Sequence, residues 1–523
     1  MRQNSIQARE GSKERRKFDA PVKLDDPLSR ETWDLVALNN NASTFHDPAG
    51  QLYLTPSHVL RRIHPALAER TRTFLDSPFR AALERSGDLV ATEIVPPTTI
   101  PSATAGELWL QHPRIDPISY PWEWTRAQWS AAADLTLRLA GQAIDAGWSL
   151  KDATPLNILF HGAQPVLVDV LSFEPRDSHS GVWLAYWQFV RTFLLPLLAA
   201  KYLGWPLEAT LFCRDGYEPA TLYRALQPWQ RLYPSLLDVV TLATLLESPA
   251  SSAQSSRRAP FISDPPMATH ILHKRVARLA KQIRHAAQAD PKSQRSGYEK
   301  IAAHYRPADM ESKQQFVQRI LDRCRPAQVL DIGANTGTYS LIAADAGAKV
   351  VALDSDRAAL EILWRTANSE KKAVTILVAN IARPTPAAGW RNQEQLSVLE
   401  RLSGRFDMVL MLAVIHQLIL REQVPLGHIG ELCACLTRRW LILEWVPPSN
   451  PMFQEWLRGR DDLYGHLSEA DLTHAFAPWF HIVDRATLSN QRTLLLLERI
   501  DTSGSGTRLD SNQRPFPCQG MNM

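Results

Sequence analysis

Apolar runs alternate with amphipathic segments in the second half of the chain. Between about residues 315 and 500, runs of strand length rich in Val, Ile and Leu are separated by stretches of helical periodicity. The runs predicted as strands are AQVLDIG, KVVALDSD, VTILVAN, FDMVLML, RRWLILEWV, WFHIVDRAT and RTLLLLERI. Such apolar strands between helices are typical of a parallel sheet covered on both faces. The last two runs flank a short LSNQ connection, which predicts an antiparallel hairpin.

The first half is dense in Trp, Leu and Ala and mixes strand and helix patterns, which predicts an α+β region. Its most apolar stretch, residues 182–205, is interrupted by two cations, a glutamine and a proline. No run of uncharged apolar residues is long enough to span a bilayer. We therefore expect a buried helix pair there and no membrane span.

Composition marks the boundaries between these regions. Residues 248–260 are rich in Ser and Ala and predict a linker. The basic amphipathic stretch 268–288 is interpreted as a solvated bridging helix, with contact to RNA or lipid as the alternative. The predicted segments are 1–30 (disordered), 31–247 (α+β domain), 248–294 (linker and basic helix), 295–500 (α/β domain) and 501–523 (disordered tail).

Charge and cysteine content exclude several classes of protein. The 58 Lys+Arg against 54 Asp+Glu give a net charge of only +4, which is no strong signal for nucleic acid. The 5 cysteines include no C-x-x-C pair, so neither a disulfide framework nor a metal site is expected. The polar, basic N-terminus is no secretory signal, and a cytoplasmic location is expected.

A glycine-bearing turn follows the first predicted strand of the second half. Asp331, Gly333, Asn335 and Gly337 recur at two-residue intervals in DIGANTGTYS. A dinucleotide fingerprint would need glycine at Thr338, and a phosphate-binding loop would need G-K-[ST]. The glycines let the backbone approach a ligand closely, and asparagine enters left-handed conformations at modest cost. This turn resembles the D-x-G-x-G-x-G motif of class I S-adenosylmethionine-dependent methyltransferases, with Asn335 in a glycine position.

Two further strand ends agree with that resemblance. Asp354 ends the second strand, where a carboxylate accepts hydrogen bonds from a ribose diol. The alternative is that Asp354 caps the following helix. At the end of the third strand, the resemblance implies that Asn380 and Ile381 meet the adenine. Asn380 is often Asp in the family.

The fourth strand end is expected to face the transferred methyl group. Leu412, Ala413 and His416 are candidates for this floor of the active site. His416 is the candidate general base, because an unperturbed imidazole titrates near neutrality. A structural histidine at the start of a helix is the alternative.

Several segments together are similar to a bacterial group of long, nodulation-protein-like methyltransferases. They are VLDIGANTGTYS, GAKVVALDSD, ANIARPTPAAGW, LAVIHQL and LEWVPPSNPMF. In that group Asn380 would be Asp, Gln417 would be His and Pro448 would be Lys. The resemblance therefore implies the cofactor and leaves the catalytic details open, including a loss of activity.

The first half carries a second pattern around residues 150–174. Asp152, Asn157 and Asp169 resemble the catalytic loop and metal-binding Asp of protein-kinase-like and aminoglycoside-phosphotransferase-like folds. The expected His and Gly-rich loop are missing, and Arg61 or Arg62 is the nearest substitute for the strand lysine. A kinase-like fold that binds or presents the methyl acceptor is the resulting expectation.

The predicted fold is thus α/β, with a Rossmann-like class I methyltransferase domain of mostly parallel, seven-stranded sheet and a kinase-like α+β domain before it. The predicted function is methyl transfer from S-adenosyl-L-methionine to an unidentified acceptor. The alternatives are phosphotransfer through Asp152, Asn157 and Asp169, and a non-catalytic protein that binds the cofactor. The sequence predicts no metal ligands and leaves the acceptor and the oligomeric state open.

Overall fold

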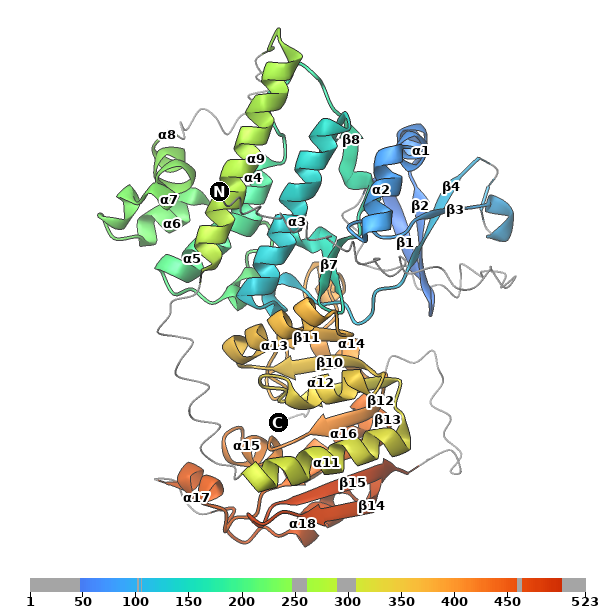
Figure 1. The fold of residues 1–523 in the computed structure, drawn as a ribbon, viewed down its shortest axis with the longest axis vertical. Helices are drawn as coiled ribbons and strands as arrows, with labels where there is room; N and C mark the ends of the chain where they lie inside the picture. The colour runs from blue at the N-terminus through green and yellow to red at the C-terminus, as the bar shows by residue number, and fades with distance from the viewer. Residues whose placement is uncertain are drawn as a thin grey trace, which may run out of the picture.

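The computed structural model describes residues 48–100, 103–104, 106–246, 261–288, 307–458 and 463–500. The segments predicted to be disordered, 1–30 and 501–523, and the Ser-rich stretch 248–260 lie outside the described residues. Figure 1 shows two parts stacked along the long axis of the molecule. The first part comprises residues 48–288 and the second part residues 307–500, and the mixed α/β fold is confirmed.

The second part is built on a seven-stranded sheet with the order β11-β10-β9-β12-β13-β15-β14. The first five strands in this order are parallel to one another, and β15 is antiparallel to both of its neighbours. The strands are β9 (Gln328–Ile332), β10 (Lys349–Asp354), β11 (Val374–Val378), β12 (Phe406–Met411), β13 (Thr437–Trp445), β14 (Phe480–Thr487) and β15 (Thr493–Arg499). Each coincides with one of the apolar runs predicted as strands.

Helices cover both faces of this sheet. They are α11 (Pro307–Cys324), α12 (Thr338–Asp345), α13 (Arg357–Glu370), α14 (Val398–Leu402), α15 (Ile415–Leu420), α16 (Leu426–Leu436), α17 (Pro451–Leu457) and α18 (Glu469–Phe476). Successive residues of a strand point to opposite faces, so Val329 belongs to one hydrophobic cluster and Leu330 and Ile332 belong to the other. The strand ends are thereby held at one edge, where the candidate site lies.

The first part opens with a four-stranded antiparallel sheet of order β1-β2-β4-β3. Its elements are β1 (Gly50–Leu54), β2 (His58–Ile63), η2 (Pro65–Leu67), α1 (Ala68–Leu75), α2 (Pro78–Ser86), β3 (Glu93–Val95), η3 (Pro97–Thr99) and β4 (Leu108–Pro113). A connection through η4 (Pro121–Glu123) leads to the long helix α3 (Arg126–Asp145), which begins with a capping box at Thr125 and Gln128. The elements after α3 are β5 (Trp148–Leu150), η5 (Pro155–Asn157), β6 (Ile158–His161), β7 (Gln164–Leu167), η6 (Val170–Ser172) and β8 (Phe173–Pro175).

The remainder of the first part is helical. Its elements are α4 (Tyr186–Phe189), η7 (Val190–Leu194), α5 (Leu195–Tyr202), η8 (Leu207–Leu211), α6 (Pro219–Ala225), η9 (Gln230–Leu232), α7 (Pro234–Leu236), η10 (Leu237–Leu242), α8 (Ala243–Leu246) and α9 (Pro265–Ala287). In the part of the chain that the structure describes, no helix is long and apolar enough to cross a membrane.

Two helical expectations are corrected here. The expected helix pair at residues 182–205 is one continuous helical run, α4–η7–α5. Its central turn is a π-helix, and such a wide turn lets the run continue through Pro196, which has no N–H to donate. The basic helix α9 is no solvated bridge, because its apolar side packs along α3 and buries Leu272, Leu279 and Ile283.

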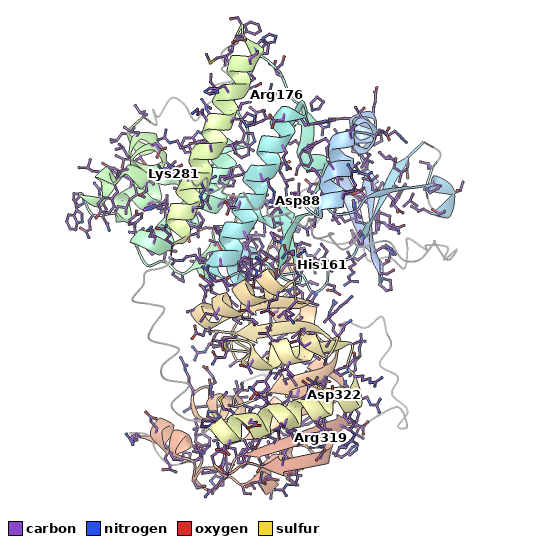
Figure 2. The ribbon with its side chains drawn as sticks, in the orientation of Figure 1. Asp88, His161, Arg176, Lys281, Arg319 and Asp322 are labelled. Atoms are coloured by element: carbon purple, nitrogen blue, oxygen red, sulfur yellow. The ribbon has the colours of Figure 1, made fainter. Side chains whose placement is uncertain are left out.

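The two parts meet at the edge strand β11. Gln128 of α3 donates from Nε2 to the backbone oxygen of Ile376 over 3.3 Å, so it bonds directly to the outer edge of the sheet. Trp364 of α13 donates to the backbone oxygen of Ala163, in the turn between β6 and β7, over 3.2 Å. Figure 2 places His161, the last residue of β6, at the junction. The first part therefore covers the edge of the sheet.

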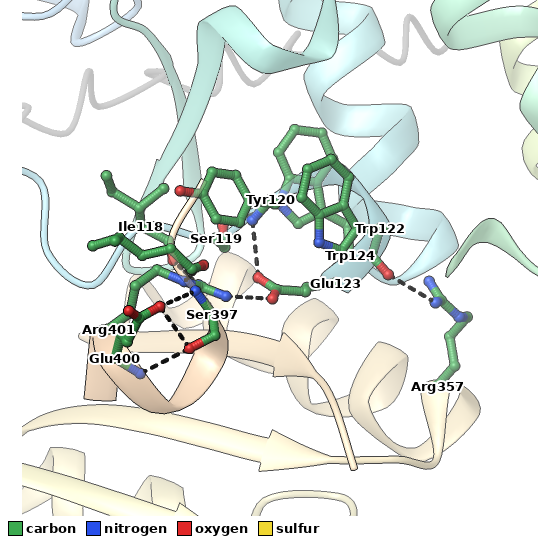
Figure 3. A network of polar contacts seen from close by, with 11 residues as sticks. Ile118, Ser119, Tyr120, Trp122, Glu123, Trp124, Arg357, Ser397, Glu400 and Arg401 are labelled. Carbon is green, nitrogen blue, oxygen red and sulfur yellow. Dashed lines mark hydrogen bonds and ion pairs between the residues drawn. The ribbon is translucent and has the colours of Figure 1, made fainter. Parts of the chain in front are cut away.

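A buried ion pair fastens the two parts together (Figure 3). Arg401 of α14 pairs with Glu123 of η4, and both residues are almost fully buried, at 2% and 0% exposure. Arg401 also donates to the backbone oxygens of Ile118 and Leu396, and its guanidinium carbon lies 4.6 Å from the centre of the Tyr120 ring. The charge that the junction buries is thus paired and hydrogen-bonded on several sides.

Candidate functional site

The turn after β9 is held in a left-handed backbone conformation at alternate positions. The φ angles are 77° at Gly333, 50° at Asn335 and 88° at Gly337. The expectation that Asn335 takes this conformation in place of a glycine is therefore confirmed. A Cβ at Gly337 would lie 2.1 Å from the Leu363 side chain, and one at Gly333 would lie 2.3 Å from Val414. Close packing as well as backbone conformation therefore demands glycine at both positions.

Asp354 ends β10 and is bonded to the glycine turn. Its Oδ2 accepts a hydrogen bond from the Asn335 N–H and its Oδ1 accepts one from the Asp356 N–H, each over 2.8 Å. The helix cap of α13 is Asp356, which accepts from the N–H groups of Ala358 and Ala359, so Asp354 is free of that role. A carboxylate has about four acceptor positions, so the hydrogen bonds from Asn335 and Asp356 leave acceptor capacity at Asp354 for a ligand hydroxyl. Burial raises the pKa of Asp354.

Asp331 lies inside the protein behind the turn. Its Oδ2 accepts a hydrogen bond from the hydroxyl of Ser340 on α12 over 2.6 Å, and the residue is buried. Burial raises the pKa of Asp331 to about 6, against the lowering effect of the Ser340 hydrogen bond and with help from the charge of Asp354. Asp331 thus ties the strand to the following helix and titrates just below neutrality.

The ends of β11 and β12 complete the rim of the site. Asn380 accepts a hydrogen bond from the Ala382 N–H over 2.9 Å, and Ile381 and Leu412 are buried. Ala413 takes a φ of 58°, which is uncommon for a residue other than glycine.

His416 is fully buried at the start of α15. Burial lowers the pKa of its imidazole to about 4. The positive charge of Arg492 lowers this pKa, and the negative charge of Glu444 raises it by a smaller amount. The imidazole is therefore neutral at pH 7 and weakly basic.

Three buried charged residues act electrostatically on His416. The Glu444 carboxylate, at the end of β13, accepts from Lys313 Nζ over 2.5 Å and from Arg492 Nη1 over 3.1 Å. The Nζ atom of Lys313, on α11, also lies 4.8 Å from the centre of the Tyr339 ring. Tyr339 belongs to α12, the helix that follows the glycine turn. We call Lys313, His416, Glu444 and Arg492 the polar wall. The sequence identified His416 but not the three charged residues, although a glutamate inside the apolar run LILEWV signals a buried cation nearby.

The three departures from the resembled group all support local turns. Asn380 binds the backbone of Ala382, Gln417 Nε2 donates to the backbone oxygen of Ala413 over 3.2 Å, and the Pro448 oxygen accepts from Gln454 over 2.7 Å. Among the residues that the structure describes, no group of three or more His, Cys, Asp or Glu side chains is placed to hold a metal ion.

In the first part, the carboxylate of Asp169 is occupied by protein groups. Its Oδ1 accepts from Arg61 Nη1 over 2.6 Å, and its Oδ2 accepts from the hydroxyl of Ser172 over 2.6 Å. Asn157 donates to that same hydroxyl over 3.2 Å, whereas Asp152 lies 3.8 Å from the ammonium of Lys151. Burial raises the pKa of Asp169, but Arg61 and Ser172 outweigh it and hold the pKa below its usual value.

Comparison with known proteins gives one relative of most of the chain and solved structures that match a smaller share of it. No family model matches the chain. The nodulation protein NoeA of Rhizobium meliloti (strain 1021) is 27% identical over 477 residues, which cover 88% of this chain and 96% of NoeA. Magnesium protoporphyrin IX methyltransferase from Synechocystis PCC 6803, solved with bound S-adenosylhomocysteine, is 21% identical, with a TM-score of 0.29 over 40% of this chain and 95% of that one.

The bifunctional kinase-methyltransferase WbdD is also 21% identical, with a TM-score of 0.28 over 37% of this chain and 40% of that one. The fold assignment rests on the strand order of the chain itself. That order and the glycine turn agree with the resemblance expected from the sequence. The chain resembles the class I S-adenosylmethionine-dependent methyltransferases.

Proposed function

We propose that the protein transfers a methyl group from S-adenosylmethionine to an acceptor, within the second part. The observation that supports this most is the pair of hydrogen bonds that join the carboxylate of Asp354 to the backbone N–H groups of Asn335 and Asp356. They hold the second-strand acid against the glycine turn and leave acceptor positions for a ribose diol.

The residues present fit this cofactor. Asp354 would accept the ribose hydroxyls, and Ile381 and Asn380 would meet the adenine at the neighbouring strand end. The glycine turn from Gly333 to Gly337 would bring its backbone to the methionine part of the ligand. Asp331 would favour the ammonium group of the ligand through its charge from behind the turn, because its carboxylate is buried against Ser340.

The bound cofactor supplies an electrophilic methyl group on its sulfonium. The chain then has to place a nucleophile in line with that group, and a protein base is needed only for an acceptor that is protonated at neutral pH. His416 would be a weak base, because its pKa lies near 4. We therefore assign His416 to the polar wall as a neutral positioning residue, with Leu412 beside the methyl group. Ion-paired Lys313, Glu444 and Arg492 would give the acceptor side a polar lining.

We also propose that the expected kinase-like domain of residues 31–247 extends to include α9, which packs along α3, and that residues 295–500 form the methyltransferase domain. The four-stranded sheet, the long helix α3 and the β6–β7 hairpin, which Asp169 follows closely, occur in the order expected of a kinase-like fold. The contact of Arg61 with Asp169 disfavours phosphotransfer, because a guanidinium occupies the carboxylate that would hold magnesium. Presenting the acceptor is the role that remains for this domain.

Calorimetric titration of the full chain with S-adenosylhomocysteine tests the cofactor assignment. Replacing Asp354 by alanine removes the acceptor of the ribose diol and should weaken binding about 10- to 100-fold, which corresponds to about 1.4–2.7 kcal/mol for the lost hydrogen bonds to a charged group. Asp356→Ala is the matched control, because it removes only the cap of α13 and should cost stability while leaving affinity unchanged. Absence of binding to the unaltered protein, or equal affinity in the Asp354 variant, would refute the assignment.

A further inference from the structure

Large hydrophobic side chains gather on one exposed segment of the first part. Between residues 229 and 246, the helices η9 to α8 leave Leu246 77% exposed, Leu232 72% exposed and Trp229 62% exposed. We call the following residues the apolar face: Trp229, Leu232, Tyr233, Leu237, Leu242, Leu245 and Leu246. In Figure 1 the helices α6, α7 and α8 form a lobe that projects sideways from the first part. Exposed hydrophobic residues are normally scattered singly, so a group of this size indicates a contact surface.

A strongly basic helix lies next to this lobe. Helix α9 contains no aspartate or glutamate from Pro265 to Ala287. Its exposed cations form what we call the basic face: Lys274, Arg275, Arg278, Lys281 and Arg284. Figure 2 labels Lys281 on this helix. The opposite side of α9 is buried against α3, so the basic face is turned outward.

Contacts at one aspartate join the apolar face to the basic face. Asp238 of η10 lies 2.7 Å from Arg278 Nη2 and accepts a hydrogen bond from Gln282 Nε2 over 3.0 Å. Leu237, a member of the apolar face, is the residue directly before Asp238. The π-helical turn of η10 brings Leu242 near the side of Leu237, since five residues span little more than one turn of such a helix. The two faces are therefore neighbours on one surface.

We propose that this surface docks the protein on an anionic lipid bilayer. Leucine side chains enter the boundary of the acyl chains, tryptophan and tyrosine favour the interfacial level, and lysine and arginine meet the anionic headgroups. A bilayer with acidic lipids offers apolar and anionic character together, which is the complement of the two faces. Docking of this kind places the whole enzyme at a membrane surface without a spanning helix.

Two other occupants fit the surface less well. A symmetric dimer would place the same surface of each copy together, so the basic faces of two α9 helices would oppose each other across the contact. A nucleic acid would satisfy the basic face but would leave the leucines of the apolar face without a partner. Charge and hydrophobicity together therefore favour the lipid surface.

Co-sedimentation of the full chain with vesicles tests the proposal. We expect binding to vesicles of phosphatidylcholine mixed with phosphatidylglycerol, and at least about tenfold weaker binding to phosphatidylcholine alone. Leu232→Ser with Leu246→Ser should weaken binding about tenfold or more, and so should Lys274→Glu with Lys281→Glu. Leu463→Ser, at an exposed leucine of the second part, is the matched control and should bind as the unaltered protein does.

Thermal unfolding followed by circular dichroism keeps a folding defect separate from a binding defect, because these exposed substitutions should leave the melting temperature unchanged. No binding to anionic vesicles overturns the proposal, and so does equal binding by both double variants. A dimer seen by light scattering that dissociates in the Leu232 and Leu246 double variant also overturns it, since the apolar face would then be occupied by a second copy.

Discussion

Replacing Arg401 by methionine removes the guanidinium that joins the two parts of the chain and leaves the carboxylate of Glu123 buried without its cation. Glu123 is 0% exposed and Arg401 is 2% exposed, so water cannot replace the lost contact. Breaking a buried ion pair by removing one partner costs about 3–5 kcal/mol. The lost hydrogen bonds to the backbone of Ile118 and Leu396 act in the same direction. We expect a loss of unfolding free energy in this range.

A double-mutant cycle separates the ion pair from the volume of the side chains. Glu123→Gln retains an acceptor for the Tyr120 N–H, which Glu123 Oε2 binds over 3.0 Å. The combined variant should lose at least about 2 kcal/mol less than the sum of the two single losses, because it leaves no unpaired buried charge. Urea unfolding of the full chain, followed by tryptophan fluorescence, measures each value, and Trp122 and Trp124 flank the pair as reporters.

The matched control is Arg383→Met. Arg383 lies 2.7 Å from the carboxylate of Glu422, and its side chain is 73% exposed. Exposed pairs contribute about 0–1 kcal/mol, so this variant should differ little from the unaltered protein. If Arg401→Met loses no more than the control, or if the losses at Arg401 and Glu123 simply add, the junction does not depend on the buried pair.

Lowering the pH from about 7 to about 5 should weaken the binding of S-adenosylhomocysteine, because Asp331, with a pKa of about 6, gains a proton in this range and loses the charge that favours the ligand's ammonium group. Asp331→Asn should flatten this dependence in calorimetric titrations, and an unchanged slope would contradict the role of Asp331. Asn335→Gly should leave the melting temperature nearly unchanged. Asn335→Val should lower the free energy of unfolding in urea by about 1–2 kcal/mol, because a β-branched residue resists a φ of 50°. Equal stability of the two variants would contradict this effect of the backbone conformation. Magnesium with ATP should leave the melting temperature of the unaltered protein where it is, because Arg61 holds the Asp169 carboxylate; a rise that Asp169→Asn abolishes would show a working nucleotide site.

The sequence predicted the second part well because its signals are local. Each strand of a doubly covered parallel sheet is a continuous apolar run, and the seven runs coincide with β9 to β15. The left-handed asparagine at position 335 was also predictable, because only a few residue types enter that conformation readily.

The polar wall was beyond the reach of such patterns. Glu444 meets Lys313 from 131 residues earlier in the chain and Arg492 from 48 residues later. Periodicity reports which face of an element is buried but not which distant side chain it meets there. The same holds for Glu123 and Arg401, which are 278 residues apart. In both cases an acid within an apolar or aromatic run was the one local sign of a buried partner.

In the first part, strand alternation decides a question that the sequence left open between two neighbouring arginines. Arg61 points inward to Asp169 with 6% exposure, and Arg62 points outward to Glu107. Successive side chains of a strand lie on opposite faces, so only one of the two reaches the interior. Which one does so depends on the register of β2 with β1 and β4, and that register is a property of the whole sheet.

The covering of β11 by the first part has a consequence for the second part when it is produced alone. All five residues of that strand are buried in the full chain, and its outer edge is closed by the first part. A separate polypeptide of residues 307–500 would carry an open edge of the sequence VTILV, which is uncharged and mostly apolar and β-branched, and such edges pair with other chains. We therefore expect the first part to protect this edge from pairing with other chains. Residues 307–500 produced alone should therefore aggregate more readily than the full chain.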